Sequence, residues 1–283
     1  MEQRIDEAEA TRLSAAAPAG AERVPGRRVR AVRGPDRERF LQGLVTNDVR
    51  RLAEGPLYAA LLTPQGKYLA DFFLVAVPEA ILIDVAAPLA DDLARRLAMY
   101  RLRAAVEITP LDLPVWRGLG PVPEGAWADP RHPLLGWRAI SEAPPAGLAE
   151  LAPGEIDWDA LRVALIVPES GIELIPNESY ILEAGFERLN GVDFRKGCYV
   201  GQEVTARMKH KASLRKGLVR VRLEGEPPPP GTPVTREGRE VGRLFTAAGG
   251  RALAHLRFDR IGEGMRAGAA ALHLDGAAEG AGG

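Results

Sequence analysis

The chain of 283 residues contains a single cysteine, Cys198. One thiol excludes an internal disulfide and is typical of a protein from a reducing compartment. It also cannot hold an iron-sulfur cluster or a structural zinc ion alone, because both need about four ligands. Any metal chemistry at Cys198 therefore needs ligands from another molecule.

The chain also lacks a large net charge, a long apolar run and a secretory signal. Lys and Arg (37) nearly balance Asp and Glu (38), so no overall field directs the protein to nucleic acid or to a membrane. The most apolar segment, residues 72–90, is interrupted by prolines and acids, which excludes a spanning helix. The N-terminus is acidic and has no apolar core, which argues against secretion. We therefore expect a cytoplasmic protein without a membrane partner.

Turn residues and apolar periodicity divide the chain into four parts. We expect a flexible extension over residues 1–23, a first α+β domain over 24–112, a second α+β domain over 113–212, and a C-terminal β-barrel over 213–283 with a disordered Gly/Ala tail. Three strands between residues 57 and 85, followed by leucines at helical spacing, indicate the α+β class. Short alternating strands after Leu214 indicate the barrel.

Residues 196–203, KGCYVGQE, carry the strongest chemical signal. Arg195 and Lys196 precede the thiol, and a helix beginning near Tyr199 or Gly201 would direct its positive end toward it; both favour the thiolate. An isolated cysteine is also an ordinary small core residue, so packing stays an alternative. The acid that follows, Glu203, is likewise ordinary in the first turn of a helix.

This segment resembles the signature KGCYxGQE of the YgfZ family of folate-binding proteins at every fixed position. Further segments match in order: VRGPDRERFLQGLVTNDV from residue 32, LLTPQGK from 61, YRLRAAVEI from 100, DPRHPLLGWR from 129, IPNE from 175 and VGRLFTA from 241. The resemblance covers most of residues 28–260. It implies two related α+β domains around a central folate cavity plus a small C-terminal β-barrel, as in the glycine-cleavage T-protein of the same superfamily.

The resemblance also implies a function. The family is thought to support iron-sulfur enzymes, including those that modify tRNA, in a folate-dependent way, and related mitochondrial proteins help to assemble four-iron clusters. The expected activity is therefore that of a tetrahydrofolate-binding factor for assembly or repair of iron-sulfur proteins, with those proteins or their assembly machinery as partners and Cys198 as the reactive or ligating group. The residues that the resemblance assigns to folate are Asn47, Asp48, Asp71, Glu178, Lys196, Tyr199, Gln202 and Glu203.

Two alternative functions stay open. The first is a folate-dependent aminomethyltransferase, because Asp71 and Glu178 are similar to acids of the T-protein; Ala164 counts against it, since it stands where the T-protein has the glutamate that binds the pterin. The second is an adaptor that binds tRNA or a partner through a basic run. Such a run is more often a solvated face. Its members are Arg207, Lys209, Lys211, Arg215 and Lys216.

Overall fold

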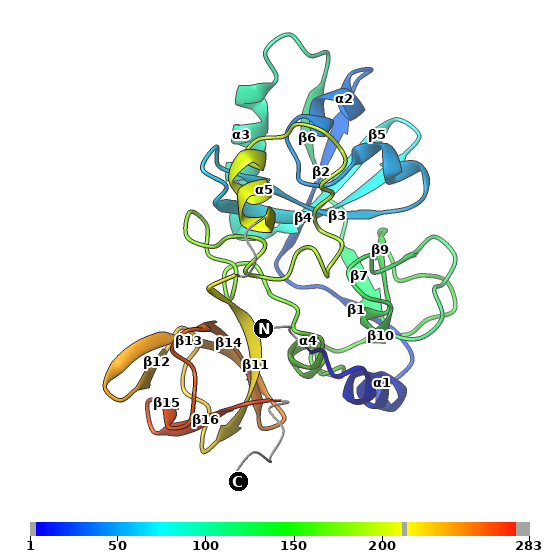
Figure 1. The fold of residues 1–283 in the computed structure, drawn as a ribbon. Coiled ribbons are helices and arrows are strands. Elements are labelled where there is room, and N and C mark those ends of the chain that lie inside the picture. The colour runs from blue at the N-terminus through cyan, green and yellow to red at the C-terminus, as the bar shows by residue number, and fades with distance from the viewer. Residues whose placement is uncertain (1–3, 211–213, 276–283) are drawn as a thin grey trace.

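The computed structural model describes residues 4–210 and 214–275 of the chain. Figure 1 shows two α+β domains next to each other and a β-barrel at one end of the molecule. The expected α+β class with a C-terminal barrel is therefore confirmed. In the part of the chain that is described, no helix has the length and apolar character needed to cross a membrane.

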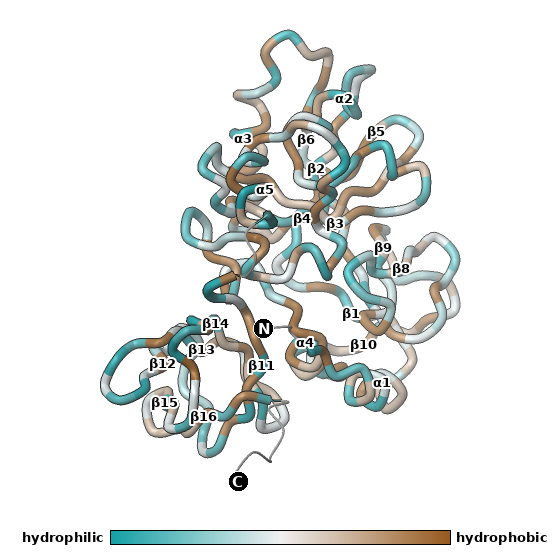
Figure 2. The backbone as a smooth tube through the Cα atoms, in the orientation of Figure 1, coloured by the Kyte–Doolittle hydropathy of each residue, from teal (hydrophilic) through white to brown (hydrophobic). Residues whose placement is uncertain are grey.

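The first domain is built on a five-stranded antiparallel sheet. Its strand order is β3 (Leu57–Leu62), β4 (Tyr68–Val77), β5 (Ala80–Ala86), β2 (Arg27–Arg33) and β6 (Glu107–Leu111). One face is covered by α2 (Arg37–Gln42), the 3-10 helix η1 (Val49–Ala53) and α3 (Ala87–Tyr100). The other face packs against the second domain, so β3 and β5 are buried along their whole length. Apolar residues accordingly follow these strands, whereas the hairpin between β12 (Pro233–Arg236) and β13 (Arg239–Ala248) of the barrel is polar (Figure 2).

The second domain contains a smaller sheet in the order β10 (Glu150–Leu151), β1 (Ala21–Arg23), β7 (Val115–Gly118), β9 (Trp137–Ile140) and β8 (Trp127–Ala128). Strand β1 pairs in parallel with β10 and antiparallel with β7. The first strand of the chain therefore belongs to the second domain. Helix α4 (Trp158–Leu165) follows, and a long series of turns leads to α5 (Gln202–His210).

The N-terminal segment corrects one prediction. The sequence favours a flexible extension over residues 1–23, but residues 7–16 form helix α1 (Glu7–Ala16), which packs against α4. Ala10 is completely buried at this contact, and the Asp6 backbone N–H donates to the Ala164 carbonyl at 2.8 Å. The small alanines of α1 allow a close approach that hydrophobic periodicity does not reveal. The predicted disordered tail, from residue 276 on, lies outside the described residues.

The C-terminal barrel closes in the order β11 (Lys216–Glu224), β14 (Arg251–Arg257), β13 (Arg239–Ala248), β12 (Pro233–Arg236), β15 (Met265–Ala267) and β16 (Ala270–Leu274). Closure leaves no free sheet edge. Its interior is filled by small and branched side chains, among them Val221, Leu244 and Ala254. It is therefore a packed support rather than a ligand cavity.

Candidate functional site

The cysteine loop, residues 193–201, is anchored to helix α2 by Lys196. The Lys196 ammonium donates to the carbonyl of Gln42 at 2.8 Å and to that of Val45. Gln42 is the last residue of α2, where carbonyls have no partner within the helix. Burial lowers the pKa of Lys196 to about 8. Lys196, assigned to folate from the resemblance, is thus placed as an anchor of the loop, and its charge is directed toward these carbonyls.

Two glycines bring the cysteine loop against the turn that precedes β4. Gly201 has φ of +84°, and a Cβ atom there would lie 2.6 Å from the Thr63 carbonyl oxygen. Gly66 of the opposing turn has φ of +74°, and a Cβ atom there would lie 2.8 Å from the Val204 side chain. Only glycine combines these backbone angles with so close an approach. Main-chain contacts therefore fix where the loop ends and where α5 begins.

The loop directs its side chains alternately inward and outward. Lys196 and Tyr199 are buried, whereas Gly197 and Cys198 are exposed. The Lys196 nitrogen lies 5.1 Å from the centre of the Tyr199 ring, and burial raises the pKa of Tyr199 to about 12. The packing alternative for Cys198 is therefore wrong. The structure presents the thiol to solvent, where a partner can reach it.

Asn47 ties the two domains together near the loop, and Asp48 is held by neighbours within the first domain. The Asn47 amide donates to the carbonyls of Tyr58 at 2.8 Å and Asn190 at 2.7 Å. The Asp48 carboxylate accepts hydrogen bonds from Arg50, which lower its pKa to about 2. Both residues have complete sets of protein partners. Both side chains therefore connect segments of the protein to one another.

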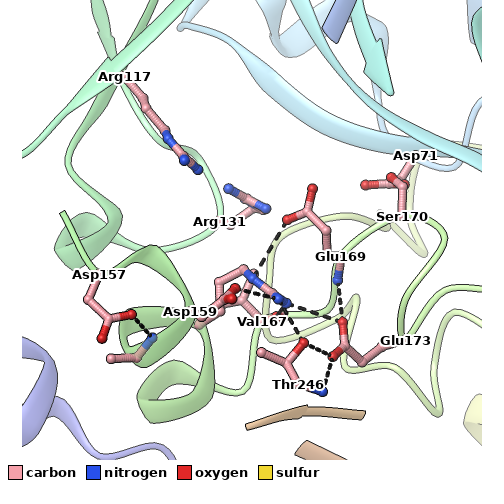
Figure 3. Close-up of polar contacts among 12 residues, drawn as sticks. Asp71, Arg117, Arg131, Asp157, Asp159, Val167, Glu169, Ser170, Glu173 and Thr246 are labelled. Atoms are coloured by element: carbon pink, nitrogen blue, oxygen red, sulfur yellow. Dashed lines mark hydrogen bonds and ion pairs between the residues drawn. The ribbon is translucent and has the colours of Figure 1, made fainter. Parts of the chain in front are cut away.

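A cavity of about 30 Å³ lies between the two domains. Asp71, the remaining aspartate of the predicted folate set, lines it. Its carboxylate accepts hydrogen bonds from the hydroxyls of Tyr58 at 2.9 Å, Tyr68 at 2.6 Å and Ser170 at 2.5 Å. Three donors leave this carboxylate little capacity for a pterin edge. Figure 3 shows Asp71 and Ser170 on one side of this region and Arg117 and Arg131 across from them.

Arginines fill the places where an aromatic ligand would stack. The guanidinium carbons of Arg131 and Arg138 lie 4.8 and 4.2 Å from the centre of the Phe73 ring. That of Arg117 lies 4.1 Å from the centre of the Trp158 ring. These cation–π contacts are favourable in a buried site, so they hold the arginines over the rings.

The closed cavity does not fit a folate. Pockets for cofactor-sized ligands have volumes of about 300–1,000 Å³, roughly ten to thirty times the volume found here. A volume of about 30 Å³ holds two or three water molecules. In addition, Ala164 is buried in α4 and offers no acceptor to a pterin. Tetrahydrofolate stays a prediction from the resemblance.

The other predicted residues lie elsewhere. Glu178 is exposed and lines an open groove of about 710 Å³ between the second domain and the barrel. Gln202 and Glu203 form the first turn of α5. None of these three lines the small cavity described above. The structure therefore separates the predicted folate residues into the cysteine loop and its supports, one cavity residue and one groove residue.

Ion pairs within the described residues neutralise part of the basic run. Lys209 pairs with Glu187, and Lys216 lies 3.5 Å from Glu183. Lys211 lies outside the described residues. The partial neutralisation favours the solvated-face interpretation over a binding site for tRNA phosphates.

The buried arginines are residues that the sequence did not assign to a site. Arg131 and Arg138 lie within DPRHPLLGWR. Arg131 pairs with Asp129 of the same segment, whereas the acidic partner of Arg138 is distant in sequence. The Arg138 guanidinium bridges to Asp84, 54 residues earlier, at 2.6 Å. The motif match gave a signal for this segment, yet only the fold shows which charges meet there.

Comparison of the structure with solved structures defines the class of the protein. It superposes on the glycine cleavage system aminomethyltransferase T from Bartonella henselae with a TM-score of 0.72, covering 94% of this chain and 88% of that chain at 15% sequence identity. At this identity the similarity concerns the fold alone. Residues 215–278 match the family model of the CAF17 C-terminal β-barrel domain. The chain thus has the T-protein-like fold with a closed barrel at its end.

The sequence comparison then gives the family. The chain is 33% identical over 278 residues to the mitochondrial iron-sulfur cluster assembly factor IBA57 of Homo sapiens, covering 84% of this chain and 78% of the relative. Identity to the mouse (Mus musculus) factor is 32% over 280 residues with the same coverage. A homologue from Mycosarcoma maydis is 34% identical over 237 residues, covering 73% of this chain and 58% of the relative. The chain therefore belongs to the family of IBA57 iron-sulfur cluster assembly factors.

These relatives correct the expected location. They are named as mitochondrial proteins, which contradicts the cytoplasmic location expected above. That expectation relies on an acidic N-terminal segment and a single cysteine, and neither feature distinguishes the cytoplasm from another reducing compartment. The relatives place the chain among the assembly factors of the superfamily, and the narrower YgfZ assignment stays a prediction.

Proposed function

We propose that the protein acts in iron-sulfur cluster assembly by supplying Cys198 as one ligand of a cluster that it shares with a partner protein. The exposure of Cys198 on an anchored loop carries this proposal. The chain has one cysteine, whereas a cluster needs about four ligands, so the partner must supply the others. The names of the relatives support the same role.

The chemistry asked of Cys198 is a ligand exchange. The thiol loses its proton as its sulfur binds one iron of the cluster, and that iron releases one of its previous ligands. No electron is transferred in this step. The loop fixes the position of the Cys198 sulfur. The buried side chains of Lys196 and Tyr199 hold the loop against the protein, so the sulfur points outward and the loop need not be reordered on binding.

Replacing Cys198 by alanine tests the proposal in cells. We expect that deleting the gene lowers the activity of four-iron enzymes, including a tRNA-methylthiolating enzyme, and that Cys198→Ala restores no more activity than an empty vector. The substitution removes an exposed side chain, so the free energy of unfolding should stay within about 0.5 kcal/mol of the wild type. Enzyme activities and urea denaturation are the two measurements. Full restoration by Cys198→Ala, or unchanged activity in the deletion strain, rejects the proposal.

The folate prediction has its own test. Because guanidinium groups cover Phe73 and the cavity is small, we expect no saturable binding when the purified protein is titrated with 5-formyltetrahydrofolate in a calorimeter. Asp71→Asn serves as the comparison variant. Saturable binding to the wild type that disappears in Asp71→Asn would show that the cavity opens for the pterin.

A further inference from the structure

An exposed apolar tip lies at the C-terminal end of helix α3. Among the described residues five large hydrophobic side chains are markedly exposed, and three of them fall in one span of four residues: Met99 at 62%, Tyr100 at 39% and Leu102 at 90%. We call residues 99–103 the α3 tip. Single exposed hydrophobic residues are ordinary, but a local cluster marks a contact surface.

The tip is held in a conformation that keeps Leu102 outside. Leu102 has φ of +43°, a left-handed conformation that is unfavourable for a residue with a side chain. Buried Leu97 and Val106 fix the chain on either side of the tip. The Ala104 backbone N–H donates to the Arg101 carbonyl at 2.7 Å, which closes the turn. The surrounding structure thus maintains a strained backbone while the apolar side chain stays in water, an arrangement typical of functional sites.

Helix α2 connects the tip to the cysteine loop. At the beginning of α2, the Asp36 carboxylate accepts a hydrogen bond from the Ala105 backbone N–H at 2.8 Å, just after the tip. At its end, the Gln42 carbonyl accepts from Lys196 of the cysteine loop at 2.8 Å. A helix of six residues is roughly 9 Å long. Figure 1 shows α2, α3 and α5 together at the end of the molecule away from the barrel.

The charges around the tip and the loop favour an acidic partner. Arg101 and Arg103 directly flank Leu102, and Arg195 lies in the cysteine loop. All three are exposed, and no ion pair of their side chains occurs among residues 4–210 and 214–275. The nearby exposed acids are Glu38 in α2, Glu107 at the start of β6 and Glu203 in α5, and with the exposed Arg39 of α2 the arginines outnumber them. Arg, Met and Tyr are also enriched where proteins contact each other.

We infer that the α3 tip and the cysteine loop together form a docking surface for an acidic protein that carries cluster-ligating cysteines. Leu102 supplies the apolar anchor, and Arg101 and Arg103 supply the charged rim. The partner would then reach Cys198 from the same side of the molecule. This inference rests on the proposed function, because shared ligation of a cluster gives the partner its reason to dock beside the thiol.

Leu102→Gly separates docking from folding. Glycine adopts positive φ without strain, so we expect the variant to be at least as stable as the wild type in urea. It nevertheless loses the anchor, so cluster-enzyme activity in the complemented deletion strain should fall. Val122→Gly, at a side chain that is 46% exposed elsewhere, is the matched control and should restore full activity. Full activity with Leu102→Gly overturns the inference.

Photocrosslinking identifies what docks. With benzoylphenylalanine at position 102 or at the exposed position 195 of the cysteine loop, in the full chain in cells, we expect both positions to capture the same acidic, cysteine-containing protein, and position 122 not to capture it. The capture at 102 should persist in Cys198→Ala and disappear in Arg101→Glu/Arg103→Glu. With the captured protein purified, Leu102→Gly should weaken binding about tenfold or more. Capture of RNA, lipid or a second copy of this chain at position 102 contradicts the inference.

The two proposals fail separately. If Cys198→Ala abolishes activity while Leu102→Gly does not, the shared cluster stands and the docking surface falls. If Leu102→Gly abolishes activity while Cys198→Ala does not, a partner docks at the tip for a purpose that does not involve the thiol.

Discussion

Asp84→Asn is expected to lower the free energy of unfolding by about 3–5 kcal/mol, because it removes the one carboxylate that two buried arginines share. The Asp84 side chain is 0% exposed and accepts from Arg27 at 2.6 Å and from Arg138 at 2.6 Å, whose side chains are 8% and 5% exposed. Arg27 belongs to the first sheet and Arg138 to the second. The substitution keeps the shape of the side chain and leaves two guanidinium charges without their shared partner. Urea denaturation measures the loss.

Asp92→Asn is the matched control. Asp92 also pairs with two arginines, Arg95 and Arg96, but its side chain is 38% exposed. Exposed pairs of this kind contribute about 0–1 kcal/mol, so the control should lose little stability. Equal losses in the two variants would show that the buried ion triad does not hold the domains together.

The contribution of Asp84 also has a defined pH dependence. Burial by itself would raise the pKa of Asp84, but the guanidinium groups of Arg27 and Arg138 lower it below the ordinary value of 3.8. Below that value the unfolded chain therefore binds more protons at this site than the folded chain does. The stability difference between wild type and Asp84→Asn should be complete above pH 4 and should shrink as the pH falls through the lowered pKa. Denaturation curves between pH 2 and pH 7 test the sign.

Glu173→Gln is expected to loosen the barrel and to cost about 3 kcal/mol of unfolding free energy. Glu173 has a completely buried side chain that joins the second domain to β13. One carboxylate oxygen accepts from the Thr246 N–H at 3.1 Å and the Thr246 hydroxyl at 2.6 Å. The other accepts from the Glu169 N–H at 2.9 Å and from Arg162 at 3.1 Å (Figure 3). In glutamine one of these oxygens becomes an NH2 group, which then faces donors.

Hydrogen exchange locates the effect of Glu173→Gln. Faster exchange should appear in β13 and α4, which flank this contact, and the first sheet should be unaffected. Glu169→Gln is the control, because Glu169 is 39% exposed and its carboxylate lies 3.7 Å from Arg162. It should cost about 0–1 kcal/mol. Unchanged exchange in β13 would indicate that other contacts hold the barrel.

Local patterns in the sequence were enough to predict several elements. The turn Thr63–Gly66 and its flanking apolar residues predict the β3–β4 hairpin, which the structure contains. The helix expected to begin near Tyr199 or Gly201 is α5, and the short strands after Leu214 form the barrel. These features depend on residues close together in the chain, where periodicity and turn chemistry act.

The geometry of the candidate site could not be predicted from the sequence, because it depends on contacts between residues that are distant in the chain. The exposure of Cys198 depends on Lys196 reaching carbonyls more than 150 residues earlier, and no local pattern encodes that contact. The cavity arginines converge from separate strands and turns, so their effect on a folate could not be predicted from any one segment. Ala164 was the one local sign that the pterin contact differs from that of the T-protein. The family resemblance predicted the fold and the motif, whereas the packing of side chains determines what the cavity beside Asp71 can bind.

The position of strand β1 has a consequence for synthesis on the ribosome. All strands of the first sheet have been made once residue 111 has left the exit tunnel, so this sheet can form early. Ala21 and Glu22, although made before it, pair with Glu150 and Leu151 and must wait for about 130 further residues. Contacts of such separation slow folding and leave early segments exposed. The nascent chain therefore carries its first strand unpaired until β7 has been made, about 95 residues later, and this segment stays accessible to chaperones while the first sheet forms.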